Sequence, residues 1–175
     1  MSVSSIKDLY VHQLIEMYNA ETQILAALPK MVKLAPTTVL QQAFDHHYNQ
    51  TVTHINRLEQ ILKAYNVQER PGENKALFAI VEQGQHLTTL IDTWLTLELA
   101  LIAAAQHVEH YEIAAYGTLH MLAVQLGDEF AAGLLELTLN EEQETDLLLS
   151  QLAMQDLQTQ PELVSHTSEE YIRPL

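Results

Sequence analysis

Apolar residues recur every three or four positions through four long segments of the chain, which is the spacing of helices that bury one face. These segments cover about 5–34, 38–65, 90–126 and 129–157, and a shorter segment of the same kind covers 74–87. Pro29 falls inside the first segment, where it predicts a kink or a break. The pattern predicts an all-α protein.

The connections between the segments differ in length. Residues 35–38 and 127–128 are short turns, and each predicts a hairpin of two antiparallel helices. A crossover of about twenty residues joins the hairpins and carries the short extra helix, which is the connectivity of ferritin-like four-helix bundles. We therefore predict one ferritin-like bundle over residues 1–160. After Pro161 a polar tail, 161–175, is expected to be partly ordered at best.

Composition narrows the chemistry that such a bundle can carry. The 175 residues include no cysteine, so any metal must be held by carboxylates and imidazoles. The formal net charge of −15 favours solubility and argues against nucleic acid or an anionic membrane as a partner. The N-terminus has no apolar stretch of signal-peptide length, and the longest apolar run, 99–105, is too short to span a membrane. We expect a cytoplasmic protein.

Acidic residues interrupt the apolar faces of three predicted helices. Glu109 and Glu112 fall on the face of the third long helix, and Glu21 lies at the margin of the first. The face of the fourth contains Glu142, with Asp146 one turn later. Buried carboxylates cost free energy unless they are protonated, paired with a basic side chain or bound to a metal ion. The alternative is that these glutamates lie on the surface of slightly rotated helices.

The second helix presents histidines instead. His47 and His54 lie on one flank of its apolar face, and Gln50 lies further round the same side. No glutamate occurs between Leu40 and Arg57. A histidine on a helix flank is as often a surface or core residue as a ligand, so each of the two stays a candidate.

Residues equally far from the turn of a hairpin lie at equal height. In the first hairpin, Glu21 faces the level of Gln50, between the two histidines. In the second, Glu109 is level with Asp146, and Glu112 is level with the neighbour of Glu142. Each hairpin thus brings its polar residues together near mid-height. The predicted metal ligands are Glu21, His47, His54, Glu109, Glu112, Glu142 and Asp146.

Two neighbouring cations need bridging carboxylates and terminal carboxylate or imidazole ligands, a set that suits iron or manganese. Di-iron bundles take a Glu from each of two helices and Glu-x-x-His from each of the other two, and the chain matches this pattern in part. We predict a site that can hold two cations but does so weakly; the alternatives are a mononuclear or a vestigial site. Residues near the pattern but expected outside the site are Glu98, His107 and His110.

The residues around this pattern resemble a known family. The run 101–119, LIAAAQHVEHYEIAAYGTL, closely resembles the signature of the YciF-like bacterial stress-protein family of the ferritin-like superfamily. Shorter matches are LY at 9–10, YNAE at 18–21, LPKM at 28–31 and TLNEE at 138–142, and the resemblance covers about 6–153. It implies a rubrerythrin-like bundle, commonly dimeric, with a candidate dimetal centre and no settled activity.

One position departs from that family, because Gln50 stands where a Glu is usual three residues after His47. An amide oxygen can bind a metal but carries no charge, so the second cation depends on the other carboxylates. Two functions therefore stay open. The first is an iron or manganese protein that acts in stress defence through peroxide or oxygen chemistry. The second is a metal-free bundle that associates with itself or with a partner.

The third long helix is apolar on more than one face, whereas a four-helix bundle needs only one apolar stripe per helix. The surplus predicts a homodimer with an isologous contact. The apolar residues that supply it are Leu90, Ile91, Trp94, Leu97, Leu99, Leu101 and Ile102.

Overall fold

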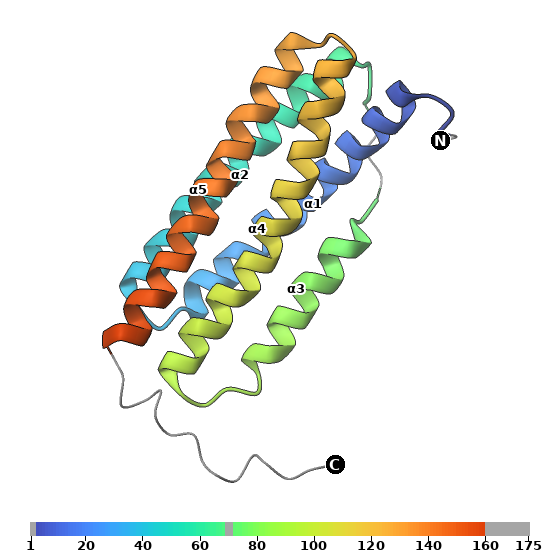
Figure 1. The fold of residues 1–175 in the computed structure, drawn as a ribbon. Coiled ribbons are helices and arrows are strands. Elements are labelled where there is room, and N and C mark those ends of the chain that lie inside the picture. The colour runs from blue at the N-terminus through green and yellow to red at the C-terminus, as the bar shows by residue number, and fades with distance from the viewer. Residues whose placement is uncertain (1–2, 69–71, 160–175) are drawn as a thin grey trace, which may run out of the picture.

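The computed structural model describes residues 3–68 and 72–159, so the tail predicted for 161–175 lies outside the described residues. Within those two ranges the chain forms helices and no strand (Figure 1). The helices are α1 (Ile6–Leu34), α2 (Thr38–Ala64), α3 (Lys75–Thr88), α4 (Trp94–Gln125) and α5 (Glu129–Thr159). The prediction of an all-α bundle is confirmed.

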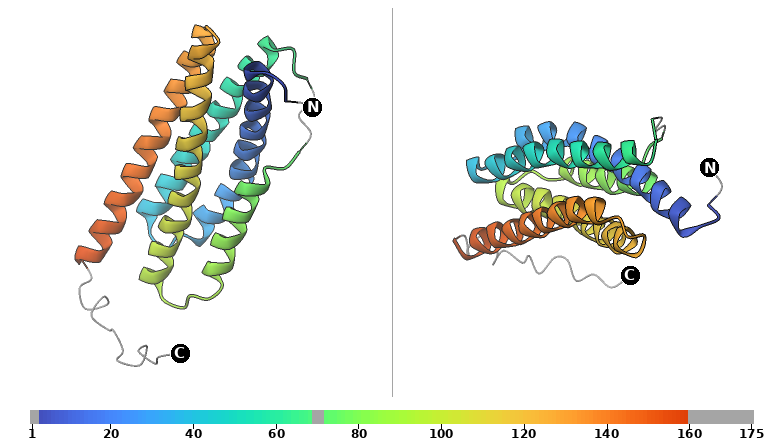
Figure 2. Two further views of the ribbon diagram at one scale, coloured as in Figure 1. Left: turned by 45° about the vertical axis from the view of Figure 1, so that its right-hand side comes forward. Right: turned by 90° about the horizontal axis from the view of Figure 1, so that it is seen from above.

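Two antiparallel hairpins pack against each other. Helices α1 and α2 form one layer, and α4 and α5 form the other, as the view from above shows (Figure 2). The crossover between the hairpins contains α3, which packs on α4 and α1. The order of long and short helices is the one expected from the apolar spacing.

Local hydrogen bonds place the starts of the helices. The side chains of Ser5, Thr37 and Asn74 accept hydrogen bonds from the backbone N–H three residues later, at 3.0, 3.2 and 2.9 Å. Such caps satisfy an N–H group that the helix itself leaves unpaired. Asp128 caps α5 in the same way, with its Oδ1 3.0 Å from the N–H of Ala131.

Helix α1 continues through Pro29 to Leu34, so of the kink or break predicted there the break does not occur. The core holds Ile24 and Leu28 just before the proline, and their burial outweighs the loss of one helical hydrogen bond. Helix α4 begins at Trp94 rather than near residue 90, because the extended backbone of Thr93 ends the preceding connection.

Helix α3 covers part of the apolar surplus of α4. A Cβ added to Gly84 would lie 2.8 Å from the Cβ of Ala104, so glycine lets the two helices approach closely. Leu101 and Ile102 are buried in the core. Among the described residues, no helix is both long and apolar enough to cross a membrane.

Candidate metal centre

Six glutamate and histidine side chains with at most 4% of their surface exposed lie in the core, near the middle of the four long helices. They are Glu21 from α1, His47 and His54 from α2, Glu109 and Glu112 from α4, and Glu142 from α5. Helical residues three or seven positions apart share a face, so the spacings on α2 and α4 turn each pair to the same side. The cluster contains only carboxylates and imidazoles, as the sequence predicts.

The cluster divides into two groups whose possible ligand atoms lie within 4.8 Å of one another. The first group is His47, Glu109, Glu112 and Glu142, and the second is Glu21, His54 and Glu142. Because Glu142 belongs to both groups, the arrangement offers two neighbouring cation positions with one carboxylate between them.

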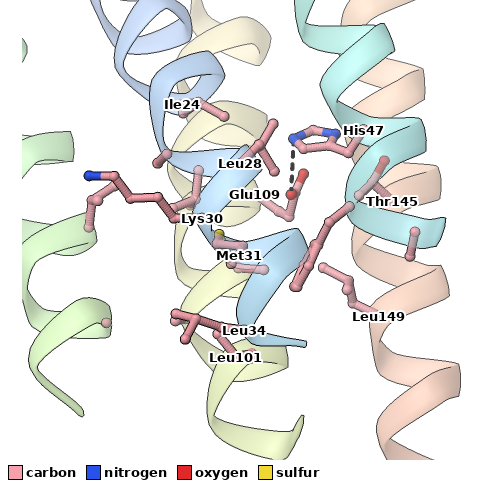
Figure 3. A pocket seen from close by; sticks show the side chains of 18 of the residues that line it. Ile24, Leu28, Lys30, Met31, Leu34, His47, Leu101, Glu109, Thr145 and Leu149 are labelled. Atoms are coloured by element: carbon pink, nitrogen blue, oxygen red, sulfur yellow. Dashed lines mark ion pairs between the residues drawn. The ribbon is translucent and has the colours of Figure 1, made fainter. Parts of the chain in front are cut away.

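The contacts within the groups are short. His47 Nε2 lies 3.4 Å from Oε1 of Glu109 (Figure 3). His54 Nδ1 lies 2.9 Å from Oε1 of Glu142 and 3.3 Å from Oε1 of Glu21. These are ion-pair distances without hydrogen-bond geometry. Within the described part of the chain, both oxygens of Glu142 and both nitrogens of His47 lack a hydrogen-bond partner.

Burial perturbs the ionisation of these groups. It raises the pKa of Glu109 and of Glu112 well above the usual value, and neighbouring carboxylates raise both further. Burial lowers the pKa of His47. Burial would also lower the pKa of His54, but contacts with carboxylates, Glu142 foremost, raise it to about 10. The cluster carries an excess of buried acidic groups that protons or cations must compensate.

A second layer of contacts fixes His54. Its Nε2 lies 2.9 Å from Oε2 of Glu141. The Glu141 carboxylate in turn accepts a hydrogen bond from each of the two terminal nitrogens of the Arg57 guanidinium. Burial opposes the ionisation of Glu141, yet hydrogen bonds and charges from Arg57 and His54 lower its pKa. On the opposite side, the Tyr116 hydroxyl donates to Oε1 of Glu21. Two ligand candidates, His54 and Glu21, are thus each held by a residue outside the cluster.

Sequence reasoning did not predict these supporting residues. Arg57 is three positions after His54, and Tyr116 is four positions after Glu112, so each shares a face with a candidate ligand. Glu141 directly precedes Glu142. These spacings were the available signal, but only the packing of α2 on α5 brings Arg57 and Glu141 together.

The structure does not bring Asp146 into either group. Its Oδ1 lies 3.1 Å from Nε2 of Gln106 and 3.2 Å from Nε2 of His110. Asp146 is one turn beyond Glu142 and has a shorter side chain, so it turns toward the flank of α4 rather than the bundle axis. Of the seven predicted ligands, Asp146 is thus the one that lies outside both groups.

Glu98 and Gln50 also lie outside both groups. Glu98 is buried away from the cluster at the start of α2, where it accepts hydrogen bonds from the N–H and the hydroxyl of Thr37. Gln50 is half-buried, and its Oε1 lies 3.5 Å from the hydroxyl of Thr145.

The comparisons with known proteins agree with this fold. The family model described as "Domain of unknown function (DUF892)" matches residues 5–161. Protein YciF of Escherichia coli (strain K12) is 37% identical over 163 residues, which are 93% of this chain and 98% of that protein.

Solved structures give the same result. The crystal structure of the E. coli stress protein YciF matches with a TM-score of 0.85 at 38% identity, covering 89% of this chain and 99% of that one. YcfI of Rhodopseudomonas palustris matches with a TM-score of 0.82 at 34% identity, covering 85% and 95% of the two chains. A protein of Xanthomonas campestris pv. campestris shares the fold at 17% identity, with a TM-score of 0.74 and coverage of 91% and 99%.

Proposed function

The chain belongs to the DUF892 family and is a relative of YciF, and from this premise we propose that it binds two iron or manganese ions between its helices. The first ion is held by His47, Glu109 and Glu112, the second by Glu21 and His54. Glu142 lies between the two groups and serves both ions. This ligand set contains only the hard oxygen and imidazole donors that both metals accept.

The balance of charge carries the proposal. The two groups contain four carboxylates and no basic side chain other than the two histidines. Two divalent cations supply four positive charges, which balance the four carboxylates when the histidines are neutral. One cation would leave two negative charges in excess in the core, where a low dielectric makes such an excess costly. The buried donor atoms without hydrogen-bond partners support the same assignment.

Iron or manganese bound there supplies redox chemistry, and the protein's own residues orient the ligands and exclude water. Glu141 and Arg57 hold the ring of His54, while Tyr116 holds Glu21. The relative YciF is described as a stress protein. We carry that description to this chain as a role in oxidative stress defence.

Metal content tests the proposal. The protein is purified from cells supplied with iron and manganese, and the bound metal is measured by mass spectrometry against protein concentration. The expected result is close to two ions per chain. A matched control is Glu98→Gln, which alters a buried glutamate outside the cluster and should leave the metal content unchanged.

A metal-free bundle with a structural role is the second candidate, because one observation favours it. The ring of His54 lies between Glu142 and Glu141, and its pKa is raised to about 10. A protonated imidazole can therefore compensate part of the buried negative charge without a metal. YcfI, a relative, is described as a candidate structural protein. Protein that contains no metal after purification from supplemented cells would favour this second function.

A further inference from the structure

A small apolar cavity of about 70 Å³ lies next to the candidate metal centre, lined by residues from all five helices (Figure 3). Its walls are side chains of the core with 6% or less of their surface exposed: Ile24, Leu28, Phe44, Leu101, Ala105 and Leu149. Most of the cavity lies outside the ligand cluster, but one end of the cavity is lined by the cluster residues His47 and Glu109.

The two ends of the cavity differ in chemistry. At the inner end His47 and Glu109 line it, and among the described residues both nitrogens of His47 and Oε2 of Glu109 have no hydrogen-bond partner. At the outer end the lining includes exposed residues of α1 and α3, among them Leu34 and Gln85. The cavity thus leads from the surface between α1 and α3 to one end of the cluster.

Size and polarity select what can occupy it. A buried water needs two to four polar partners, whereas an apolar cavity of roughly 150 Å³ stays dry and binds benzene or xenon. About half that volume leaves room for a diatomic molecule or a xenon atom, and not for an alkyl chain. Before the inner end, the apolar walls offer hydrogen peroxide no partner for its donors and acceptors, so its passage along them costs free energy.

We propose that this cavity binds a small apolar molecule of the size and polarity of dioxygen and leads it to the His47–Glu109 end of the cluster. Delivery to a metal rests on the proposed function. Binding of the apolar molecule does not, because its contacts are with the apolar core side chains, and the two proposed ligands, His47 and Glu109, lie only at the inner end.

Xenon is the probe for binding in the metal-free protein. Crystals of the chelator-treated protein under xenon pressure should show xenon between Phe44, Leu28 and Ala105. Ala105→Leu should remove that xenon, because the larger side chain fills the cavity; Ala105→Val is the milder variant if the first does not fold. Ala103→Leu changes an exposed alanine on the same helix and should retain the xenon. A wild-type cavity without xenon, or xenon that persists in folded Ala105→Leu and Ala105→Val, overturns the proposal.

Delivery is tested on protein loaded with Fe(II). Ala105→Leu should slow oxidation of the bound iron by dioxygen several-fold, with the iron content unchanged, and should leave oxidation by hydrogen peroxide at the wild-type rate. If Ala105→Leu slows iron oxidation equally with both oxidants, or does not slow oxidation by dioxygen, the proposed path of dioxygen through the cavity is wrong. If the wild type takes up xenon but binds no iron, the proposed function fails while the apolar binding site stands.

Discussion

Glu141 accepts the Nε2 proton of His54 across a distance of 2.9 Å, and this contact decides which ring nitrogen faces the cluster. The pKa of Glu141 is lowered by Arg57 and His54, so its carboxylate is ionised and can only accept. The pKa of His54 is about 10, so without a metal Nδ1 carries a proton as well. When a cation displaces that second proton, the proton kept on Nε2 makes Nδ1 the nitrogen that binds it. Contacts of this kind fix the tautomer and the orientation of metal-binding histidines.

Removing this contact should weaken metal binding without removing a ligand. Glu141→Ala frees the ring of His54 and should lower metal affinity by about 10–100-fold, the usual effect of losing a residue that orients a ligand. Competition with a chelator of known affinity measures the change. Glu144→Ala alters an exposed glutamate on the same helix and is the control. An affinity equal to that of the wild type would show that Glu141 does not orient His54.

Glu112→Gln and Glu142→Gln should each reduce metal loading more than Glu98→Gln does. All three glutamates are buried, but only Glu112 and Glu142 belong to the groups that can hold an ion. Because Glu142 belongs to both groups, its replacement should cause the larger loss. Metal analysis of the variants purified side by side gives the comparison, and equal loading in all of them would mean that the site is placed wrongly.

Gln50→Glu should change the metal count little. The four carboxylates of the cluster already balance two divalent cations, so a further carboxylate beside His47 is not needed for charge. Metal analysis of the two proteins in parallel measures the count. A rise from no metal to two ions would contradict the expectation and would show that the natural protein has lost its centre through Gln50.

Glu98 should make stability depend on pH in the metal-free protein. Burial raises its pKa above the usual value. The folded state therefore favours protonated Glu98. The resulting contribution of Glu98 to the stability of the fold is complete below about pH 4.5 and is lost as pH rises through the raised pKa. As pH rises from 4.5 through the raised pKa, the free energy of unfolding of the wild type should fall relative to that of Glu98→Gln. The expected fall is about 1.4 kcal/mol for each unit by which the pKa is raised. Denaturant titrations in chelator from pH 4 to pH 8 measure it; a relative stability that rises with pH would reverse the assignment.

The protein is predicted to be a homodimer in solution. Helix α3 packs on α4 and covers part of its apolar surface. Leu90, in the connection before α4, and Trp94, at its start, stay 66% and 45% exposed. Light scattering at micromolar concentration should give twice the mass of the chain. Trp94 is the single tryptophan, so its emission should shift to longer wavelength when the dimer is diluted into monomers. A mass equal to one chain would rule the dimer out.

The helices and their order could be predicted from the amino-acid sequence, because the signals are local. The apolar spacing and the caps at Ser5, Thr37 and Asn74 act within a few residues. The height of the candidate ligands along each hairpin could also be predicted, because a short turn fixes which residues of its two helices lie at the same height. Glu21 and His54, on the two helices of the first hairpin, lie close together for that reason.

Which side chains point at one another across helices could not be predicted in this way. Asp146 has the right height but turns to Gln106 and His110, and the contact of Arg57 with Glu141 joins helices from different hairpins. Such contacts depend on the rotation of each helix about its axis and on the packing between hairpins. Neither is encoded in the spacing along a single helix, because helices that differ by a small rotation share the same apolar pattern.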